Sequence, residues 1–299
     1  MLCHHILLLA TGVLVPGATA EQPEVKEPRV LRGHTGAVAA VVFVGDGKIL
    51  ASGSSDKTVR LWNVSDGMEL AKLTGHSAEV QTLAITRDGK LLASGDKDGG
   101  VILWDTDSRK EVRMLKGEKV TGSVLKFSPD GKILAAGGGG YDEAAKKGWG
   151  KIRLLDPATG QETAAFEGLD NRVTSIAFSP DGKLLASCCA NGSAYLWEVD
   201  SARKKFILGE NPNGGCSVTY SPDGKMIVCG SFVRSTVVKI WDASNGKEIH
   251  TIEKIGPSTL SLAFLPDSKT LLVGGFNQNR ITDKGDSRGI RGLVGCGHR

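Results

Sequence analysis

The sequence is poor in the side chains that build metal and cofactor sites. Six histidines are spread over 299 residues, and none of the six cysteines has the Cys-x-x-Cys spacing of zinc ribbons or haem attachment. The run Asp96-Lys97-Asp98-Gly99 resembles the start of a calcium loop, but Gly100 stands where the third ligand is needed. We therefore expect no metal and no cofactor.

The cysteines also do not fit a disulfide framework. An odd number of five remains after the first twenty residues: Cys188, Cys189, Cys216, Cys229 and Cys296. We expect most of them to be small apolar core residues. Because side chains alternate along a strand, adjacent Cys188 and Cys189 should point to opposite faces of a sheet.

Basic and aromatic residues are too sparse for a nucleic-acid surface. The formal net charge is +4, and residues 280–299 supply +3 of it, from five Lys and Arg against two Asp. Aromatic residues make up 5% of the chain, whereas such a surface needs a clustered basic face with stacking aromatics. We expect no nucleic-acid partner.

Long apolar stretches are absent except at the start of the chain. Residues 6–15 are apolar, Pro16-Gly17 follows, and Ala18-Thr19-Ala20 has the small residues of a cleavage site. The pattern predicts a signal peptide over residues 1–20 and a secreted or periplasmic protein, with a cytoplasmic location as the alternative because few positive charges precede the apolar stretch. The stretch is too short to span a bilayer, so we expect no membrane span in the mature chain.

The sequence is rich in one repeated turn. It occurs as GDGK at 45–48, RDGK at 87–90, SPDGK at 128–132, 179–183 and 221–225, and LPDSK at 265–269. The turn aspartates are therefore 42, 42, 51, 42 and 44 residues apart. Each turn separates two apolar runs, and a third run such as VRLWN or VILWD follows. This repeated order of turns and apolar runs predicts about four short antiparallel strands per unit. The expected fold is all-β, and the repeat length is that of a propeller blade.

Two dipeptide pairs show which family the repeat resembles. Gly33-His34 precedes Trp62-Asn63, and Gly75-His76 precedes Trp104-Asp105. The chain resembles the WD-repeat β-propellers, of a bacterial type with SPDGK turns. The resemblance implies a propeller of four-stranded antiparallel blades over residues 31–279, with five clear blades and a sixth that is degenerate or incomplete. Residues 21–30 would supply a closing strand, and 280–299 an irregular basic tail. Either the sixth blade is completed irregularly or the chain is truncated.

The resemblance also implies a buried, hydrogen-bonded set of side chains in each blade, here called the staple. The expected sets are His34, Ser52, Asp56 and Trp62 in the first blade, and His76, Ser94, Asp98 and Trp104 in the second. The fourth blade retains Ser187 and Trp197 with Asn191 in place of Asp, and the fifth retains Trp241 with Cys229 in place of Ser. The third has Glu118 for His and Leu155 for Trp. We expect the later blades to depend on apolar packing and to open more easily.

Partner contacts in such propellers cluster at the loops before the first strand and between the second and third strands of a blade. Carried over to this sequence, the resemblance implies ten candidate positions there: Ala37, Ala39, Ser55, Glu79, Gln81, Lys97, Thr121, Ser123, Arg172 and Thr174.

One stretch breaks the period, AAGGGGYDEAAKKGWGK at 135–151. A phosphate loop is excluded, because Ala145 stands where the first glycine belongs and Ile152 follows Gly150-Lys151. The interval from turn Lys to closing Trp is 14 residues in three blades, but here Lys132 to Leu155 spans 23. The nine extra residues predict an extended hairpin loop with Tyr141 and Trp149 as aromatic anchors for a partner.

These patterns favour a non-enzymatic, exported scaffold that binds protein partners. Outside the signal and the staples, only His250 and His298 remain for a catalytic triad. The alternatives are a periplasmic propeller resembling that of the Tol system, a propeller enzyme, or a fragment of a larger multidomain protein.

Overall fold

The computed structural model describes residues 30–115, 121–210, 214–231, 237–253, 258–276 and 291–296. Every regular element in these ranges is a strand, and none of them contains a helix with the length and apolar character needed to cross a membrane. The predicted signal peptide, all but the last residue of the 21–30 segment and most of the 280–299 tail lie outside these ranges.

The strands form six sheets in chain order, here called blades one to six. Their strands, in the same order, are β1 (Val38–Val44), β2 (Ile49–Ser54), β3 (Val59–Asn63), β4 (Glu69–Leu73); β5 (Val80–Ile85), β6 (Leu91–Asp96), β7 (Val101–Asp105), β8 (Lys110–Leu115); β9 (Thr121–Phe127), β10 (Leu134–Asp142), β11 (Lys147–Leu155), β12 (Glu162–Leu169); β13 (Val173–Phe178), β14 (Leu184–Cys189), β15 (Ser193–Glu198), β16 (Arg203–Glu210); β17 (Gly215–Tyr220), β18 (Met226–Ser231), β19 (Val237–Asp242), β20 (Glu248–Glu253); β21 (Ser258–Phe264), β22 (Thr270–Phe276) and β23 (Arg291–Cys296).

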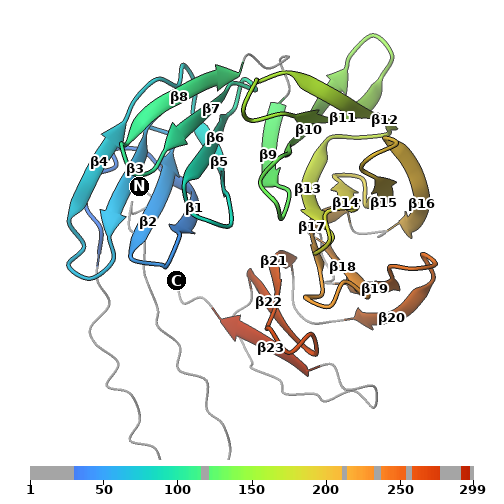
Figure 1. Ribbon diagram of the computed structural model, residues 1–299. Coiled ribbons are helices and arrows are strands. Elements are labelled where there is room, and N and C mark those ends of the chain that lie inside the picture. Colours follow the sequence, from blue (N-terminus) through green and yellow to red (C-terminus); the bar gives the residue numbers. More distant parts are fainter. Residues whose placement is uncertain are drawn as a thin grey trace, which may run out of the picture.

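Blades one to five are four-stranded and antiparallel, each strand pairing with the next, which confirms the predicted all-β propeller. The first strand of each blade faces the middle of the arrangement, and the fourth lies outside (Figure 1). Successive first strands contact one another from β1 to β21. This arrangement places the turns of all blades at the two ends of the strands.

Blade six lacks the four-stranded antiparallel pattern of the other five, and the sequence predicted a degenerate or incomplete sixth blade. Its third strand, β23, pairs with β22 in parallel, with Thr270 opposite Arg291. A parallel pair needs a crossover connection rather than a hairpin, and the residues between the two strands, 277–290, lie outside the described ranges. The repeat's alternation ends at the same place in the sequence.

The repeated Asp-Gly turn joins the first and second strands of a blade. In blade three, the Ser128 hydroxyl donates to Asp130 Oδ1 at 2.6 Å and the Lys132 amide donates to the same oxygen at 3.1 Å. Gly131 supplies the positive φ of 73° that other residues adopt at a cost. A Cβ on Gly182, the equivalent glycine of blade four, would lie 3.4 Å from Pro129 Cδ. Neighbouring turns therefore pack on one another as well as closing their own hairpins.

The hydrophobic cores lie between blades rather than within them. One cluster joins Ala51 and Leu61 of blade one to Leu92 and Trp104 of blade two, and four further clusters join the later blades in the same way. A blade therefore has an upstream face, which packs on the preceding blade, and a downstream face, which packs on the following one. Burial of apolar surface between these faces, at about 25 cal/mol per Å², is the main term that holds the blades together.

The expectation about cysteines needs one correction. Cys188 and Cys229 form a disulfide between β14 and β18, with their Cα atoms 7.2 Å apart. Cys188 lies on the downstream face of blade four and Cys229 on the upstream face of blade five, in one core cluster. Cys189 points to the opposite face, into the core between blades three and four, where it is buried as a free thiol.

Candidate partner-binding face

The loops predicted to contact partners are joined in pairs at one end of the blades. The Ser55 amide donates to the Ala37 carbonyl at 2.8 Å, and the Lys97 amide donates to the Glu79 carbonyl at 2.9 Å. A third bond of this kind joins the Ala190 amide to the Arg172 carbonyl at 2.8 Å. In each of these blades the loop before the first strand therefore lies beside the loop between the second and third strands.

The staple of blade one connects the same two loops beneath this face. His34 Nδ1 lies 2.8 Å from Asp56 Oδ2, and His34 Nε2 lies 2.8 Å from Ser52 Oγ. Trp62 Nε1 donates to Ser52 Oγ at 2.8 Å, so the structure brings together all four predicted side chains. Since His34 precedes the first strand and Asp56 follows the second, the staple holds the two loops in a fixed arrangement.

Blade two corrects one predicted staple residue. His76 Nδ1 lies 2.9 Å from Asp96 Oδ2, not from Asp98, and His76 Nε2 and Trp104 Nε1 meet at Ser94 Oγ. Asp98 is exposed. In blade one the Thr58 hydroxyl holds Asp56 in place at 2.6 Å, but blade two has Gly100 at that position.

Gly100 also creates the space that Asp96 uses. A Cβ at Gly100 would lie 2.8 Å from Asp96 Oδ2, so a larger residue would force the carboxylate to shift. Asp96 Oδ1 accepts from the amides of Asp98 at 3.1 Å and Gly100 at 2.8 Å. The glycine pair 99–100 is the feature of the sequence that could have shown that Asp96, rather than Asp98, is the staple aspartate of blade two.

Burial sets the protonation state of the second staple. Desolvation lowers the pKa of His76 below its usual value, and the nearby Asp96 and Glu111 carboxylates offset this only in part. A neutral ring donates from Nδ1 to Asp96 and accepts at Nε2 from the Ser94 hydroxyl, which itself accepts from Trp104 Nε1. Every polar atom of this chain is satisfied without a buried positive charge.

In blade one, burial and hydrogen bonds have opposite effects on the pKa of the Asp56 carboxylate. Burial alone would raise the pKa of Asp56, but hydrogen bonds from Thr58, His34 and the Thr35 amide outweigh it and hold that pKa well below its usual range. Asp56 is therefore ionised over the whole physiological pH range.

Blades four and five replace the missing staple partners in different ways. Trp197 Nε1 donates to Ser187 Oγ at 2.9 Å, as in the full staples, whereas Asn191 accepts only from the nearby Ser193 amide. The Tyr195 hydroxyl instead donates to Asp170 Oδ2 at 3.0 Å. In blade five, Trp241 Nε1 is buried without a partner, since Cys229 occupies the serine position. The sequence did not point to the pair of Asp170 and Tyr195.

The long insertion of blade three is a strand extension rather than a loop. Its two strands, β10 and β11, stay in register as far as Asp142 opposite Lys147. Their pairing with β9 and β12 ends at Gly139 and Gly150, so residues 140–149 project beyond the neighbouring strands as a hairpin at the top of Figure 1.

Two glycines explain how the base of this hairpin is held. A Cβ on Gly139 would lie 2.8 Å from Arg172 Cα, and a Cβ on Gly150 would collide with the Asn171 carbonyl oxygen. The chain at 171–172, which leads into blade four, therefore packs directly on the hairpin backbone. The glycine run permits this close approach.

The two aromatic side chains of the hairpin are exposed on opposite faces. Tyr141 pairs with Gly148 and Trp149 with Gly140, and their exposed fractions are 57% and 36%. Trp149 lies over Gly140, whose Cβ would be 3.1 Å from the indole nitrogen. The hairpin thus presents two large aromatic surfaces on a base held by close backbone packing.

The remaining predicted positions differ in how accessible they are. Ala37, Ala39, Lys97 and Arg172 are exposed, and Ser55, Glu79 and Gln81 are half-buried. The Thr174 hydroxyl donates to the carbonyls of Cys188 and Gly215, which makes it a link between blades rather than a free contact. Thr121 and Ser123 lie on β9, but their side chains are outside the described part of the structure.

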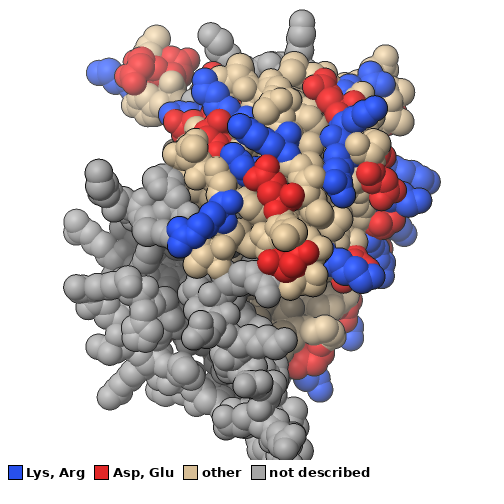
Figure 2. All heavy atoms as spheres, turned by 90° about the vertical axis from the view of Figure 1, so that its left-hand side faces the viewer, with Lys and Arg blue, Asp and Glu red and all other residues tan. Residues whose placement is uncertain are grey.

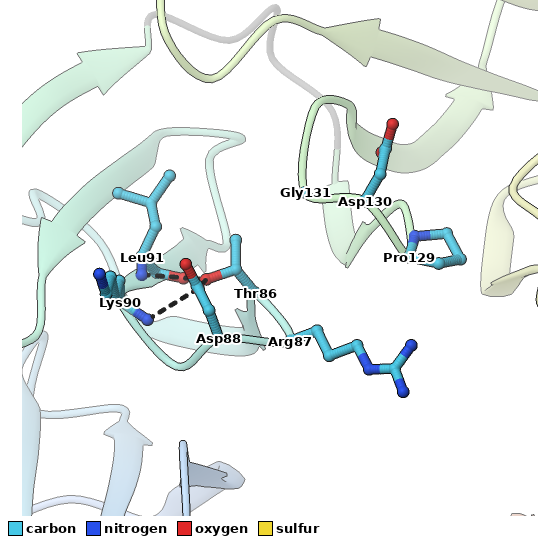
Figure 3. A pocket seen from close by; sticks show the side chains of 8 residues that line it. All are labelled: Thr86, Arg87, Asp88, Lys90, Leu91, Pro129, Asp130 and Gly131. Atoms are coloured by element: carbon cyan, nitrogen blue, oxygen red, sulfur yellow. Dashed lines mark hydrogen bonds between the residues drawn. The ribbon is translucent and has the colours of Figure 1, made fainter.

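The opposite end of the blades has a cleft of about 490 Å³ between the Asp-Gly turns of blades two and three (Figure 3). Its walls are Thr86 to Asp88, Lys90, Leu91 and the turn at 129–131. Asp88 accepts hydrogen bonds from the Thr86 hydroxyl at 2.6 Å and from the Lys90 amide at 3.1 Å. Its carboxylate therefore stabilises the turn in which it lies. Within the described residues no cluster of His, Cys, Asp or Glu could hold a metal ion.

Charges on the outer side of the molecule are mixed. Figure 2 shows lysines and arginines interspersed with acidic residues on the side of the described region that carries β4 and β8. A cross-strand pair of Arg60 with Glu69, between β3 and β4 of blade one, accounts for part of this pattern. No single-sign patch covers the described residues on this side.

Comparison with known proteins gives a consistent set of matches. The family model "WD domain, G-beta repeat" matches residues 25–63, 67–105, 160–198 and 210–242. The chain is 33% identical to the small ribosomal subunit protein RACK1 of Caenorhabditis elegans over 265 residues, which is 85% of this chain and 78% of that protein. Coronin-7 of Mus musculus is 30% identical over 137 residues, 44% of this chain and 15% of that protein. An uncharacterized WD repeat-containing protein of Synechocystis sp. is 30% identical over 129 residues, 43% of this chain and 36% of that protein.

Proposed function

Because the chain belongs to the WD-repeat family, we propose that it is a non-enzymatic scaffold that binds protein partners through the loop end of its blades. The β10–β11 hairpin carries this proposal. Tyr141 and Trp149 are the largest exposed aromatic groups at that end in the described residues. Binding energy in protein interfaces concentrates in such aromatic anchors.

The surroundings of the hairpin fit a protein partner. Its tip adds Asp142, Glu143, Lys146 and Lys147, all exposed, and exposed Arg172 lies against its base. Charges of both signs around two aromatic groups match the polar rim and apolar centre of protein interfaces. Because close backbone packing holds the base of the hairpin, we expect less entropy to be lost on binding.

Affinity capture with matched variants tests the binding site. The immobilised chain is incubated with an extract of its native host, beside a Tyr141→Ala, Trp149→Ala double variant and a Met68→Ala control. Met68 is an exposed apolar residue in the β3–β4 turn region, away from the loop end. We expect the wild type and the control to retain the same proteins, and the double variant to retain them at least tenfold less.

Equal capture by all three chains, with unchanged thermal melting, would contradict the assignment of the hairpin. Exchange of charges on blade two, Glu79→Lys with Lys97→Glu, extends the test across the face. If that variant alone loses the captured proteins, the partner binds at blade two instead.

We also propose that the protein is exported. This rests on the apolar stretch at 6–15 and the small residues at 18 and 20, which have the layout of a cleaved signal. The mass of the chain purified from its native host should correspond to a start at Glu21. A mass that includes residues 1–20 would refute export by this signal.

A further inference from the structure

The joint between blades four and five is held by a covalent bond. Cys188 on β14 is linked to Cys229 on β18 by the disulfide, and both side chains are fully buried in the core between the two blades. Among the described residues, the other four cores between blades are apolar clusters without a disulfide. The covalent link therefore joins one particular pair of neighbouring blades.

Cys229 also stands at a staple position. It occupies the place in β18 that Ser187 occupies in β14, as the register of each with the following strand shows. In blade four Trp197 Nε1 donates to the Ser187 hydroxyl at 2.9 Å, and Trp241 is the equivalent tryptophan of blade five. Its Nε1 is buried without a partner in the described residues, and the sulfur in the place of the serine hydroxyl is bonded to Cys188. Blade five therefore has a crosslink to blade four where other blades have a staple.

Two hydrogen bonds between first strands also cross this joint. The Thr174 hydroxyl donates to the Gly215 carbonyl at 3.1 Å, and the Val218 amide donates to Ser175 Oγ at 3.0 Å. These bonds and the apolar core do not depend on the disulfide, so the reduced joint should stay assembled. The disulfide instead limits its opening, since it links residues 41 apart in the sequence and such a crosslink removes conformations from the opened state.

We propose that the Cys188–Cys229 disulfide is a redox-sensitive crosslink that controls how often blade five separates from blade four. A dithiol reductant would supply the two electrons and two protons. One of its thiolates attacks a sulfur of the disulfide, the sulfur–sulfur bond breaks, and its second thiol then releases the mixed disulfide. The products are two cysteine thiols in the protein and a disulfide in the reductant. This inference does not depend on the proposed partner at the hairpin, which belongs to blade three.

The neighbouring thiol does not compete in this exchange. Cys189 follows Cys188 directly, but its side chain lies in the core between blades three and four. Burial raises the pKa of Cys189 to about 12, so it is a thiol rather than the thiolate that attacks disulfides. Since Cys188 and Cys229 are themselves buried, an external dithiol reaches them only when the joint opens. The rate of reduction therefore reports the opening of this joint.

Hydrogen–deuterium exchange of the full chain, before and after reduction, tests the proposal. The protein is purified without reductant, and mass spectrometry of its peptides should show Cys188 linked to Cys229. Dithiothreitol in excess is the probe, and loss of the linked peptide shows when reduction is complete. After reduction we expect the amides of β18 and β19 to exchange about tenfold faster or more. The amides of β2, β3, β6 and β7, in the two blades with full staples, should keep their rates.

Two variants serve as controls. Cys188→Ala with Cys229→Ser lacks the crosslink, so dithiothreitol should leave its exchange unchanged. Cys189→Ala retains the crosslink and should respond to dithiothreitol as the wild type does, which assigns the response to the disulfide. The wild-type comparison itself needs no substitution, so its result holds even where a variant folds poorly.

Four results would overturn the proposal. One is the presence of Cys188 and Cys229 as free thiols in protein purified without reductant. Another is a disulfide that excess dithiothreitol leaves intact in the folded protein. A third is unchanged exchange in blade five after complete reduction. The fourth is equal acceleration in every described blade, which would make the disulfide a general stabiliser rather than a control on one joint.

Discussion

The identity of the second staple aspartate leads to a direct test of how these blades are held. In blade two, Asp96 is buried and accepts from His76 Nδ1 and from the amides of Asp98 and Gly100. Asp98 occupies the position that the repeat pattern assigns to the staple, but its side chain is exposed. Replacing each aspartate by alanine therefore tests whether the structure or the repeat pattern identifies the staple aspartate correctly.

The expected magnitude follows from the three bonds that Asp96→Ala removes. A hydrogen bond to a charged group contributes about 1.5–3 kcal/mol, and a buried donor left without a partner costs about 1–3 kcal/mol. The amides near Asp98 can reach water, but the His76 ring is buried. We expect Asp96→Ala to lower the free energy of unfolding by about 3–4 kcal/mol, and Asp98→Ala to change it by no more than about 0.5 kcal/mol.

Urea unfolding followed by tryptophan fluorescence measures both variants. A double-mutant cycle of Asp96→Ala with His76→Ala should give a coupling of about 1–3 kcal/mol, because the two side chains are in contact. The corresponding cycle of Asp98 with His76 should give none beyond error. A larger loss for Asp98→Ala, or additivity of Asp96 with His76, would refute the assignment.

Three other predictions follow from the structure. Burial lowers the pKa of His76, so the stability that this residue contributes is present above about pH 6.5 and is lost as pH falls towards the folded pKa. Between pH 7.5 and pH 5, the thermal midpoint of the wild type should therefore drop more than that of His76→Gln. Equal drops in the two midpoints would contradict this. In the presence of reductant, Cys229→Ser should be about 1 kcal/mol more stable than Cys229→Ala, because a serine hydroxyl can accept from Trp241 Nε1; equal denaturation midpoints would count against it. Gly139→Ala should cost about 1–3 kcal/mol by overpacking, whereas Gly274→Ala, whose Cβ would have only ordinary contacts, should cost less than half as much in the same urea assay.

Local chemistry made most of the fold predictable from the sequence. Asp-Gly turns between alternating apolar runs specify hairpins, and their near-constant spacing specifies equivalent blades. The first staple was predictable for the same reason, since His34, Ser52, Asp56 and Trp62 all keep the expected spacing. Where the repeat is intact, spacing along the chain determines which atoms meet.

Spacing along the chain did not predict the staple correctly where either of two residues could occupy the same position in the structure. Asp96 and Asp98 are two residues apart in the sequence, and it is Asp96 that bonds to His76, in the space that the missing side chain at Gly100 leaves. The pair of Asp170 and Tyr195 was missed because neither residue belongs to the repeat pattern. The disulfide between Cys188 and Cys229 was missed since it joins faces of different blades, whose approach depends on the packing of whole sheets.

The sequence by itself determined the repeated blade, its turns and its first staple, because these depend on neighbours within about 40 residues along the chain. Only the tertiary structure decided which apolar and aromatic side chains are exposed and where the aromatic hairpin projects. Exposure of Val41, Phe43, Tyr141 and Trp149 depends on what lies opposite each side chain. That is set by the arrangement of blades around the centre, which a local pattern does not encode.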